Sequence, residues 1–138
     1  MSILRWSDAY VDALVLGDSP VVVELRSGEI VALIDDRLAR LPGRRHYEPL
    51  PRNHPAANDR WRQLVQYERS KRNQPGGYWI AEANPEAARH ALAGRWGRFD
   101  VSHALALTDG IADCVTVFRA LPDWRDRKST RLNSSHLG

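Results

Sequence analysis

Short apolar runs separated by turn-forming residues dominate the first third of the chain. They occupy residues 2–6, 10–16, 21–25 and 30–34. Runs of this length, bounded by turn residues, are typical of strands buried in a sheet. Residues 26–29 predict a hairpin turn, because Gly28 can adopt positive φ without a steric penalty. On pattern alone, an antiparallel meander without any attached chemistry is equally compatible with these runs.

The middle of the chain changes from strand-like to loop-like and then to helical. Residues 41–57 hold four of the eight prolines and several arginines, which predicts a loop or lid. Residues 58–73 are predicted to form an amphipathic helix, capped by Asn58 or Asp59. The apolar side chains that share one face at helical spacing are Trp61, Leu64 and Val65.

The last third alternates between predicted strands and predicted helices. Residues 78–81 and 101–107 are short apolar runs and are expected to be strands. Residues 85–93 are compatible with a helix or a strand, and proline followed by Glu-Ala-Ala at their start favours a helix locally. Another helix is expected to start within residues 111–118. The large aromatic side chains expected to pack in the core or beneath the loop are Trp61, Trp79 and Trp96.

Length and composition limit the class of protein. The chain has 138 residues, 43% apolar and 27% charged, as expected for one globular domain. No apolar run reaches the ~20 residues that span a bilayer, and no secretory signal is recognisable. We therefore expect a cytoplasmic protein with no membrane partner. The single cysteine, Cys114, excludes an intrachain disulfide and a cysteine-cluster zinc site.

The net charge of +3 comes largely from the end of the chain. Without residues 126–138 the net charge is +1, from 17 basic and 16 acidic side chains. The arginines are scattered along the chain, so we expect no nucleic-acid partner. The segment Arg44-Arg45-His46 could grip a phosphate or could be a solvated part of the loop, and both interpretations stay open.

Residues 126–138 are predicted to be a disordered tail of artefactual origin. The string Asp-Arg-Lys-Ser-Thr-Arg-Leu-Asn-Ser-Ser-His resembles one reading frame of a common sequencing adapter. Because the match is to an ordered string and not to a composition, the tail is excluded from fold reasoning. The natural gene is expected to continue past Arg125. The folded part is therefore expected within residues 1–125.

The segment with the most chemical content is residues 104–113, Ala-Leu-Ala-Leu-Thr-Asp-Gly-Ile-Ala-Asp. A buried strand here would deliver Asp109 at its end, and Gly110 would let the backbone turn beside a ligand. If a helix follows, Asp113 lies about one turn from Asp109 and can face the same cleft. Clustered carboxylates repel one another and are stabilised by hard divalent cations such as Mg²⁺ or Mn²⁺. A turn and a solvated helix residue are the simpler interpretation of each aspartate alone.

Two motifs resemble the PP2C-type, metal-dependent protein serine/threonine phosphatases. Residues 107–113, Leu-Thr-Asp-Gly-Ile-Ala-Asp, are similar to the family's late Asp-Gly-Ile-Trp-Asp block. Residues 16–21, Leu-Gly-Asp-Ser-Pro-Val, resemble its Gly-Asp-Ser-Arg strand pair. The order and approximate spacing fit, and residues 75–81 look like the bacterial branch of the family. The resemblance covers residues 3–124, the middle-to-late part of such a domain.

The resemblance implies an α+β fold, a partial αββα sandwich of antiparallel sheets flanked by helices, with metal ions in a cleft at one end. It implies that Asp109 is a core metal ligand, and that Asp18 and Asp113 join it around an additional, weaker metal ion. The ions would be Mg²⁺ or Mn²⁺ and the substrate a phosphorylated protein. The implied reaction is hydrolysis of phosphoserine or phosphothreonine by metal-activated water, without a covalent nucleophile.

Several positions depart from the family pattern. The early Asp-Gly-His-Gly and late Asp-Asn blocks are absent, Pro20 replaces an arginine, and Ala112 replaces an aromatic residue. Residues 35–37, Asp-Asp-Arg, match the family's aspartate-histidine pair only loosely. Because the bridging metal pair lacks ligands, we expect this fragment to be inactive as a hydrolase. The alternatives are a non-catalytic PP2C-like scaffold that binds phosphopeptides or partner proteins, and an unrelated β-rich interaction module.

Overall fold

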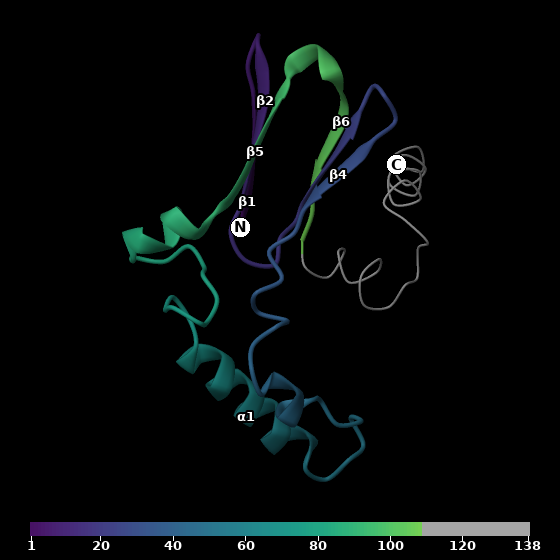
Figure 1. The fold of residues 1–138 in the computed structure, drawn as a ribbon. Helices are drawn as coiled ribbons and strands as arrows, with labels where there is room; N and C mark the ends of the chain where they lie inside the picture. The colour runs from purple at the N-terminus through teal and green to yellow at the C-terminus, as the bar shows by residue number, and fades with distance from the viewer. Residues whose placement is uncertain (109–138) are drawn as a thin grey trace, which may run out of the picture.

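Two antiparallel sheets of three strands each form the frame of the described part of the molecule (Figure 1). The structure, a computed structural model, describes residues 1–108. The first sheet contains, in spatial order, β1 (Ser2–Trp6), β2 (Tyr10–Val15) and β5 (Leu92–Gly97). The second sheet contains β4 (Ile30–Leu33), β3 (Val21–Leu25) and β6 (Val101–Ala106). With helix α1 (Ala57–Ser70), these sheets confirm the predicted α+β fold class.

The core lies between the two sheets. Alternate residues of β2 are buried, as expected for a strand with one inward face. The buried side chains of this core are Val11, Ala13, Val15, Val21, Val23 and Val101. The partly buried side chains that pack against it include Leu4, Leu33, Leu92 and Trp96. β-branched residues dominate because they fill the pleated surface with few rotamers to lose.

The predicted strands near residues 2–6, 10–16, 21–25, 30–34 and 101–107 are confirmed within one or two residues. The hairpin turn between β3 and β4 is confirmed too, and Gly28 has the positive φ, 89°, expected there. The Gly28 N–H donates to the Leu25 carbonyl at 2.9 Å, and the Leu25 N–H donates to the Glu29 carbonyl at 2.8 Å. The turn therefore closes through its own backbone.

Residues 36–73, called the arm below, lie beyond the ends of the two sheets (Figure 1). In the arm, α1 packs against the 3₁₀ helix η1 (Arg44–Tyr47), which forms inside the predicted loop. The Tyr47 and Tyr67 rings stack with centroids 5.0 Å apart. Arg44 Nε donates to Glu68 Oε1 at 2.9 Å, while Arg45 is exposed. The basic residues of η1 therefore do not converge on one anion site.

Two predictions about α1 are wrong. The helix begins at Ala57 and no side-chain hydrogen bond caps it, so neither Asn58 nor Asp59 is its N-cap. Trp61 is not packed in the core, because it is 57% exposed, whereas Leu64 is buried. The physical reason is that α1 contacts η1 and the loop before it through the side that carries Arg60 and Tyr67, and Trp61 lies outside these contacts.

The predicted strand at residues 78–81 is wrong. This segment makes only an isolated parallel bridge, between Arg72 and Tyr78. Beyond the bridge, Trp79 turns into a buried cluster with Leu16 and Ala87. The apolar residues of this run are therefore buried as a packed loop without a strand partner.

Residues 85–93, for which helix and strand were both open, divide between the two. Pro85–His90 forms a 3₁₀ helix, η2, and the Asn84 side chain caps it by accepting the Glu86 N–H at 3.1 Å. Leu92–Gly97 is strand β5, and on sequence alone a strand was open only for its first two residues. It forms because β2 offers an edge, along which Leu92 and Trp96 reach the core. Tertiary pairing here outweighs local propensity.

We predict that Gly77→Ala destabilises the fold more than Gly76→Ala. A Cβ at position 77 would lie 1.8 Å from the Lys71 carbonyl oxygen, so the backbone would have to move. That displacement should cost roughly 2–3 kcal/mol of unfolding free energy. Gly76 has φ 74° but open space around it, so alanine there should cost about 1 kcal/mol. Urea unfolding of both variants measures the difference, and equal losses would contradict the packing of this turn.

Candidate functional site

Asp18 lies in the link between β2 and β3, where the chain crosses from the first sheet to the second. Its side chain is exposed. Gly17 before it has φ 81°, a conformation that favours glycine, and Pro20 at the other end of the link is fully buried. The link is therefore anchored on both sides, while the Asp18 carboxylate remains accessible.

Strand β6 ends beside this link. It pairs antiparallel with β3, with Val21 opposite Ala106 at the last register position. The Leu107 N–H then donates to the Pro20 carbonyl at 2.9 Å. The chain therefore leaves β6 at the end of the second sheet where the Asp18 link enters it. The other two predicted ligands, Asp109 and Asp113, lie outside the described residues.

Within residues 1–108, no three His, Cys, Asp or Glu side chains come together as metal ligands. Of the three predicted ligands, only Asp18 belongs to this part of the chain. Its carboxylate oxygens are the donor type that Mg²⁺ and Mn²⁺ prefer. Asp18 therefore fits the implied metal as one ligand, and a complete ligand set requires the positions beyond 108.

A buried aspartate holds the link from the protein interior. Asp35 follows β4 and is 6% exposed. Its Oδ2 accepts the Gly17 N–H at 2.8 Å, and the Arg37 Nε donates to its Oδ1 at 2.7 Å. Arg37 Nη2 donates both to Asp35 Oδ2 at 2.7 Å and to the His90 carbonyl at 2.6 Å. This Asp35–Arg37 clamp joins the Asp18 link, the segment after β4 and the segment before β5.

The clamp is an ion pair at neutral pH. Burial by itself would raise the pKa of Asp35, because the carboxylate loses hydration. Hydrogen bonds from the Arg37 guanidinium and the Gly17 N–H outweigh this effect, so the pKa of Asp35 lies below its ordinary value of 3.8. The hydrogen bond to Asp35 likewise raises the pKa of Arg37.

An aromatic stack lies next to the clamp. The Trp79 and His90 rings stack with centroids 3.8 Å apart and planes 6° apart. Trp79 is 5% exposed, so its predicted packing role is confirmed. Because Arg37 binds the His90 carbonyl, the stack and the clamp restrain the same stretch of backbone before β5.

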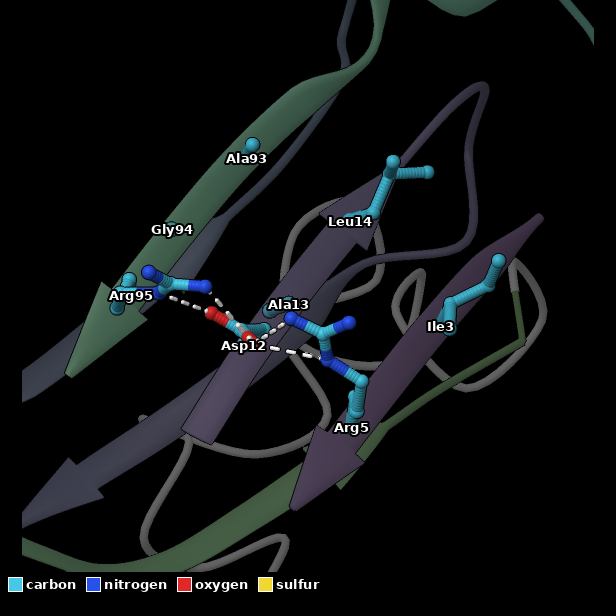
Figure 2. A pocket seen from close by; sticks show the side chains of 8 residues that line it. All are labelled: Ile3, Arg5, Asp12, Ala13, Leu14, Ala93, Gly94 and Arg95. Atoms are coloured by element: carbon cyan, nitrogen blue, oxygen red, sulfur yellow. Dashed lines mark hydrogen bonds and ion pairs between the residues drawn. The ribbon is translucent and has the colours of Figure 1, made fainter. Parts of the chain in front are cut away.

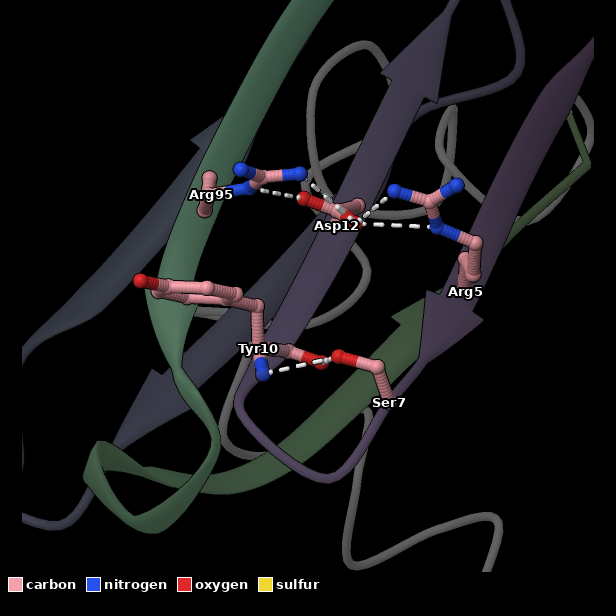
Figure 3. A network of polar contacts seen from close by, with 5 residues as sticks. All are labelled: Arg5, Ser7, Tyr10, Asp12 and Arg95. Atoms are coloured by element: carbon pink, nitrogen blue, oxygen red, sulfur yellow. Dashed lines mark hydrogen bonds and ion pairs between the residues drawn. The ribbon is translucent and has the colours of Figure 1, made fainter.

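A second polar group lies on the outer face of the first sheet (Figures 2 and 3). Asp12 in the middle strand is flanked by Arg5 of β1 and Arg95 of β5, each with a shortest N···O distance of 2.6 Å. Figure 2 shows the two guanidinium groups approaching the carboxylate from neighbouring strands. Hydrogen bonds from Arg95, and then from Arg5, hold the pKa of Asp12 below its ordinary value. The Arg95 guanidinium also lies 4.7 Å from the centre of the Tyr10 ring.

Apolar residues border this ionic row. The register pairs Ile3 with Leu14 and Leu14 with Ala93, in the row next to the charged one. Together the two rows line a hollow of about 530 Å³.

The other contacts near this row are structural. In Figure 3, Ser7 closes the β1–β2 hairpin, where its Oγ accepts the Tyr10 N–H at 2.9 Å. Because two arginines already share the carboxylate, the lining offers no free base or nucleophile, and the network serves to tie three strands together.

Sequence reasoning missed both polar groups as units. Asp12 stood out only as an interruption of an apolar run, and its partner Arg95 is 83 residues away. Asp35 and Arg37 appeared only as a loose match to a family motif, because the burial of Asp35 is visible only in the structure. No local pattern predicts either pairing, because the partners meet only in the folded chain.

Comparisons with known proteins return no relative. No family model, no curated protein and no solved structure matches the chain. In the part of the chain that the structure describes, no helix has the length and apolar character needed to cross a membrane. The resemblance to PP2C-type phosphatases therefore stays a hypothesis that rests on the two motifs.

We predict that Asp35→Asn lowers the unfolding free energy by roughly 2–4 kcal/mol. Breaking a buried ion pair typically costs about 3–5 kcal/mol, and the 29% exposure of Arg37 reduces that loss. Asp36→Asn is the matched control, because Asp36 pairs with Arg40 on the surface, and it should cost less than about 1 kcal/mol. Denaturant unfolding at neutral pH compares the two. A loss at position 36 as large as at position 35 would contradict the account of the clamp.

We also predict that stability falls as the pH drops below about 4. The pKa values of Asp12 and Asp35 are lowered in the folded state, so the unfolded state binds more protons in acid. Their contribution is complete above the unfolded pKa and is lost as the pH falls through the folded pKa. Unfolding free energies measured from neutral pH into acid should show a shallower decline for Asp35→Asn than for the wild type. Parallel profiles would contradict the role assigned to Asp35.

Proposed function

We propose that this chain is the middle-to-late part of a PP2C-type, metal-dependent protein serine/threonine phosphatase domain. In this proposal Asp18, Asp109 and Asp113 bind Mg²⁺ or Mn²⁺, and the substrate is a phosphorylated protein. When bound, the metal supplies activated water for hydrolysis of a phosphate ester. The role of this chain is to bring carboxylates from two distant segments to one end of the β-sandwich.

The observation that carries the proposal is the hydrogen bond between the Leu107 N–H and the Pro20 carbonyl, at 2.9 Å. It brings the end of β6 to the link that contains Asp18. Asp18 lies two residues before Pro20 and Asp109 two residues after Leu107, and two residues span at most about 7 Å on each segment. The register therefore supports a shared cation site for Asp18 and Asp109.

The clamp behind the link supports the same proposal. A metal ligand must be held by backbone that does not move when the ion binds. The Gly17 N–H, immediately before Asp18, is bound to a buried carboxylate that is itself held by Arg37. The two stacked antiparallel sheets also agree with the sandwich that the resemblance implies.

We predict that Asp18→Ala and Asp109→Ala each weaken Mn²⁺ binding by about tenfold or more, because each removes a direct oxygen ligand. Asp8→Ala is the control, since Asp8 is an exposed aspartate in the turn between β1 and β2. Titration calorimetry of the full chain with MnCl₂ measures all three. An equal effect of Asp8→Ala would mean non-specific binding, and the absence of any Mn²⁺ binding by the wild type would overturn the proposal.

We further predict that the chain as given does not hydrolyse p-nitrophenyl phosphate in the presence of Mn²⁺. Phosphoryl transfer by this mechanism needs a pair of positioned metal ions, and the chain lacks the early and late ligand blocks. A colorimetric assay with and without the metal chelator EDTA tests this. Mn²⁺-dependent turnover that disappears in Asp18→Ala would contradict the expected inactivity while supporting the metal site.

A further inference from the structure

Charge is divided unevenly along the described chain. The arm, residues 36–73, contains ten Lys and Arg against four Asp and Glu, a net charge of +6. Residues 1–35 contain two Arg against six Asp and Glu, a net charge of −4. The arginines are spread along the chain but are densest in the arm. The excess of positive charge is concentrated in the arm, which lies beyond the ends of the sheets (Figure 1).

One face of α1 combines this positive charge with an exposed aromatic ring. Four residues at positions 61, 62, 65 and 69 lie within about a third of the helix circumference. They are called the Trp61 face and are Trp61, Arg62, Val65 and Arg69. Trp61 is 57% exposed and the Arg62 side chain 76% exposed. Arg69 is exposed as well, and Val65 is half-buried.

The opposite side of α1 is already occupied by η1 and the loop before it. Leu64 is buried there, and the Tyr67 hydroxyl donates to the Pro42 carbonyl. Arg60 Nη1 donates to the His46 carbonyl at 2.6 Å. The helix is thus oriented by contacts on one side. The Trp61 face is therefore exposed because these contacts hold the other side of α1 against η1 and the loop.

The two arginines of the Trp61 face are available to a partner. The nearest carboxylate to Arg62 is Asp59, at 3.5 Å, and both side chains are about three-quarters exposed, so this pair contributes little. Within residues 1–108, Arg69 makes no ion pair. Tryptophan and arginine are the residue types that most often dominate the binding energy of protein interfaces.

We propose that the Trp61 face docks an acidic polypeptide segment, with carboxylates on Arg62 and Arg69 and an apolar side chain against Trp61. The net positive charge of the arm would speed and orient the encounter. A single-stranded nucleic acid fits less well, because such ligands stack successive bases on several exposed aromatic rings. Tyr47 and Tyr67 stack on each other, so Trp61 is the one ring on the Trp61 face that is open to a base. The proposal does not depend on the phosphatase assignment.

The experiment titrates the full chain into a fluorescein-labelled synthetic peptide of glutamates around a central Leu-Phe pair and records anisotropy. Binding should weaken as salt rises. Arg62→Glu with Arg69→Glu, and separately Trp61→Ala, should each weaken it by roughly tenfold or more. Arg26→Glu is the matched control, because it makes the same charge change at an exposed site in the β3–β4 turn and should leave affinity unchanged. Circular dichroism verifies that each variant is folded. The double variant Arg62→Gln with Arg69→Gln removes the two positive charges without adding negative ones, so it is the milder test.

Four outcomes would overturn the proposal. The first is no binding of the acidic peptide by the wild type. The second is equal binding of a peptide with lysine in place of glutamate, which would assign the surface to apolar contact alone. The third is an equal loss in Arg26→Glu, which would reduce the effect to net charge. The fourth is binding of oligouridylate at a salt concentration where the acidic peptide no longer binds, which would assign the face to nucleic acid.

Discussion

The Asp35 carboxylate is the contact on which the arrangement of the two sheets most depends. It binds the Gly17 N–H where the chain leaves the first sheet, and it binds Arg37, which in turn binds the His90 carbonyl just before β5. A buried charge without a partner is costly, so alternative paths for these segments are disfavoured. The link that carries Asp18 consequently has a defined course at one end of the sandwich, and the candidate site inherits its geometry from a structural ion pair.

The sequence was sufficient to predict the strands whose own side chains fill the core. In β2 alternate residues are buried, and in β3 three consecutive valines are buried, a pattern visible in the chain without knowledge of the partners. Strand β5 was not predictable in this way, because Leu92–Gly97 contains two glycines and only two large apolar side chains. It exists because β2 has an edge to pair with, and Gly94 leaves space where a Cβ would lie 2.4 Å from the Trp96 ring.

A candidate ligand of the site could be named from the sequence, but not the residues that hold it in place. Asp18 was singled out through the resemblance of its Gly-Asp-Ser sequence to a family motif, whereas the pairing of Gly17 with Asp35 spans 18 residues and that of Arg37 with His90 spans 53. The basic arm could have been found by adding charges segment by segment. The exposure of Trp61 could not, because helical spacing with Leu64 favours a buried position, and only the folded chain decides which side of α1 packs against η1.

In the proposed metal site, the Asp18 link and the chain leaving β6 share one cation. The most direct measurement is amide NMR of the full chain during addition of substoichiometric Mn²⁺, whose unpaired electrons broaden nearby signals. If the two segments share the ion, Asp18, Ser19 and Thr108 broaden first, while Ser27 and Glu29, at the opposite end of β3 and β4, keep their intensity. Broadening centred on Asp12, or spread evenly over the acidic residues, would contradict the shared site.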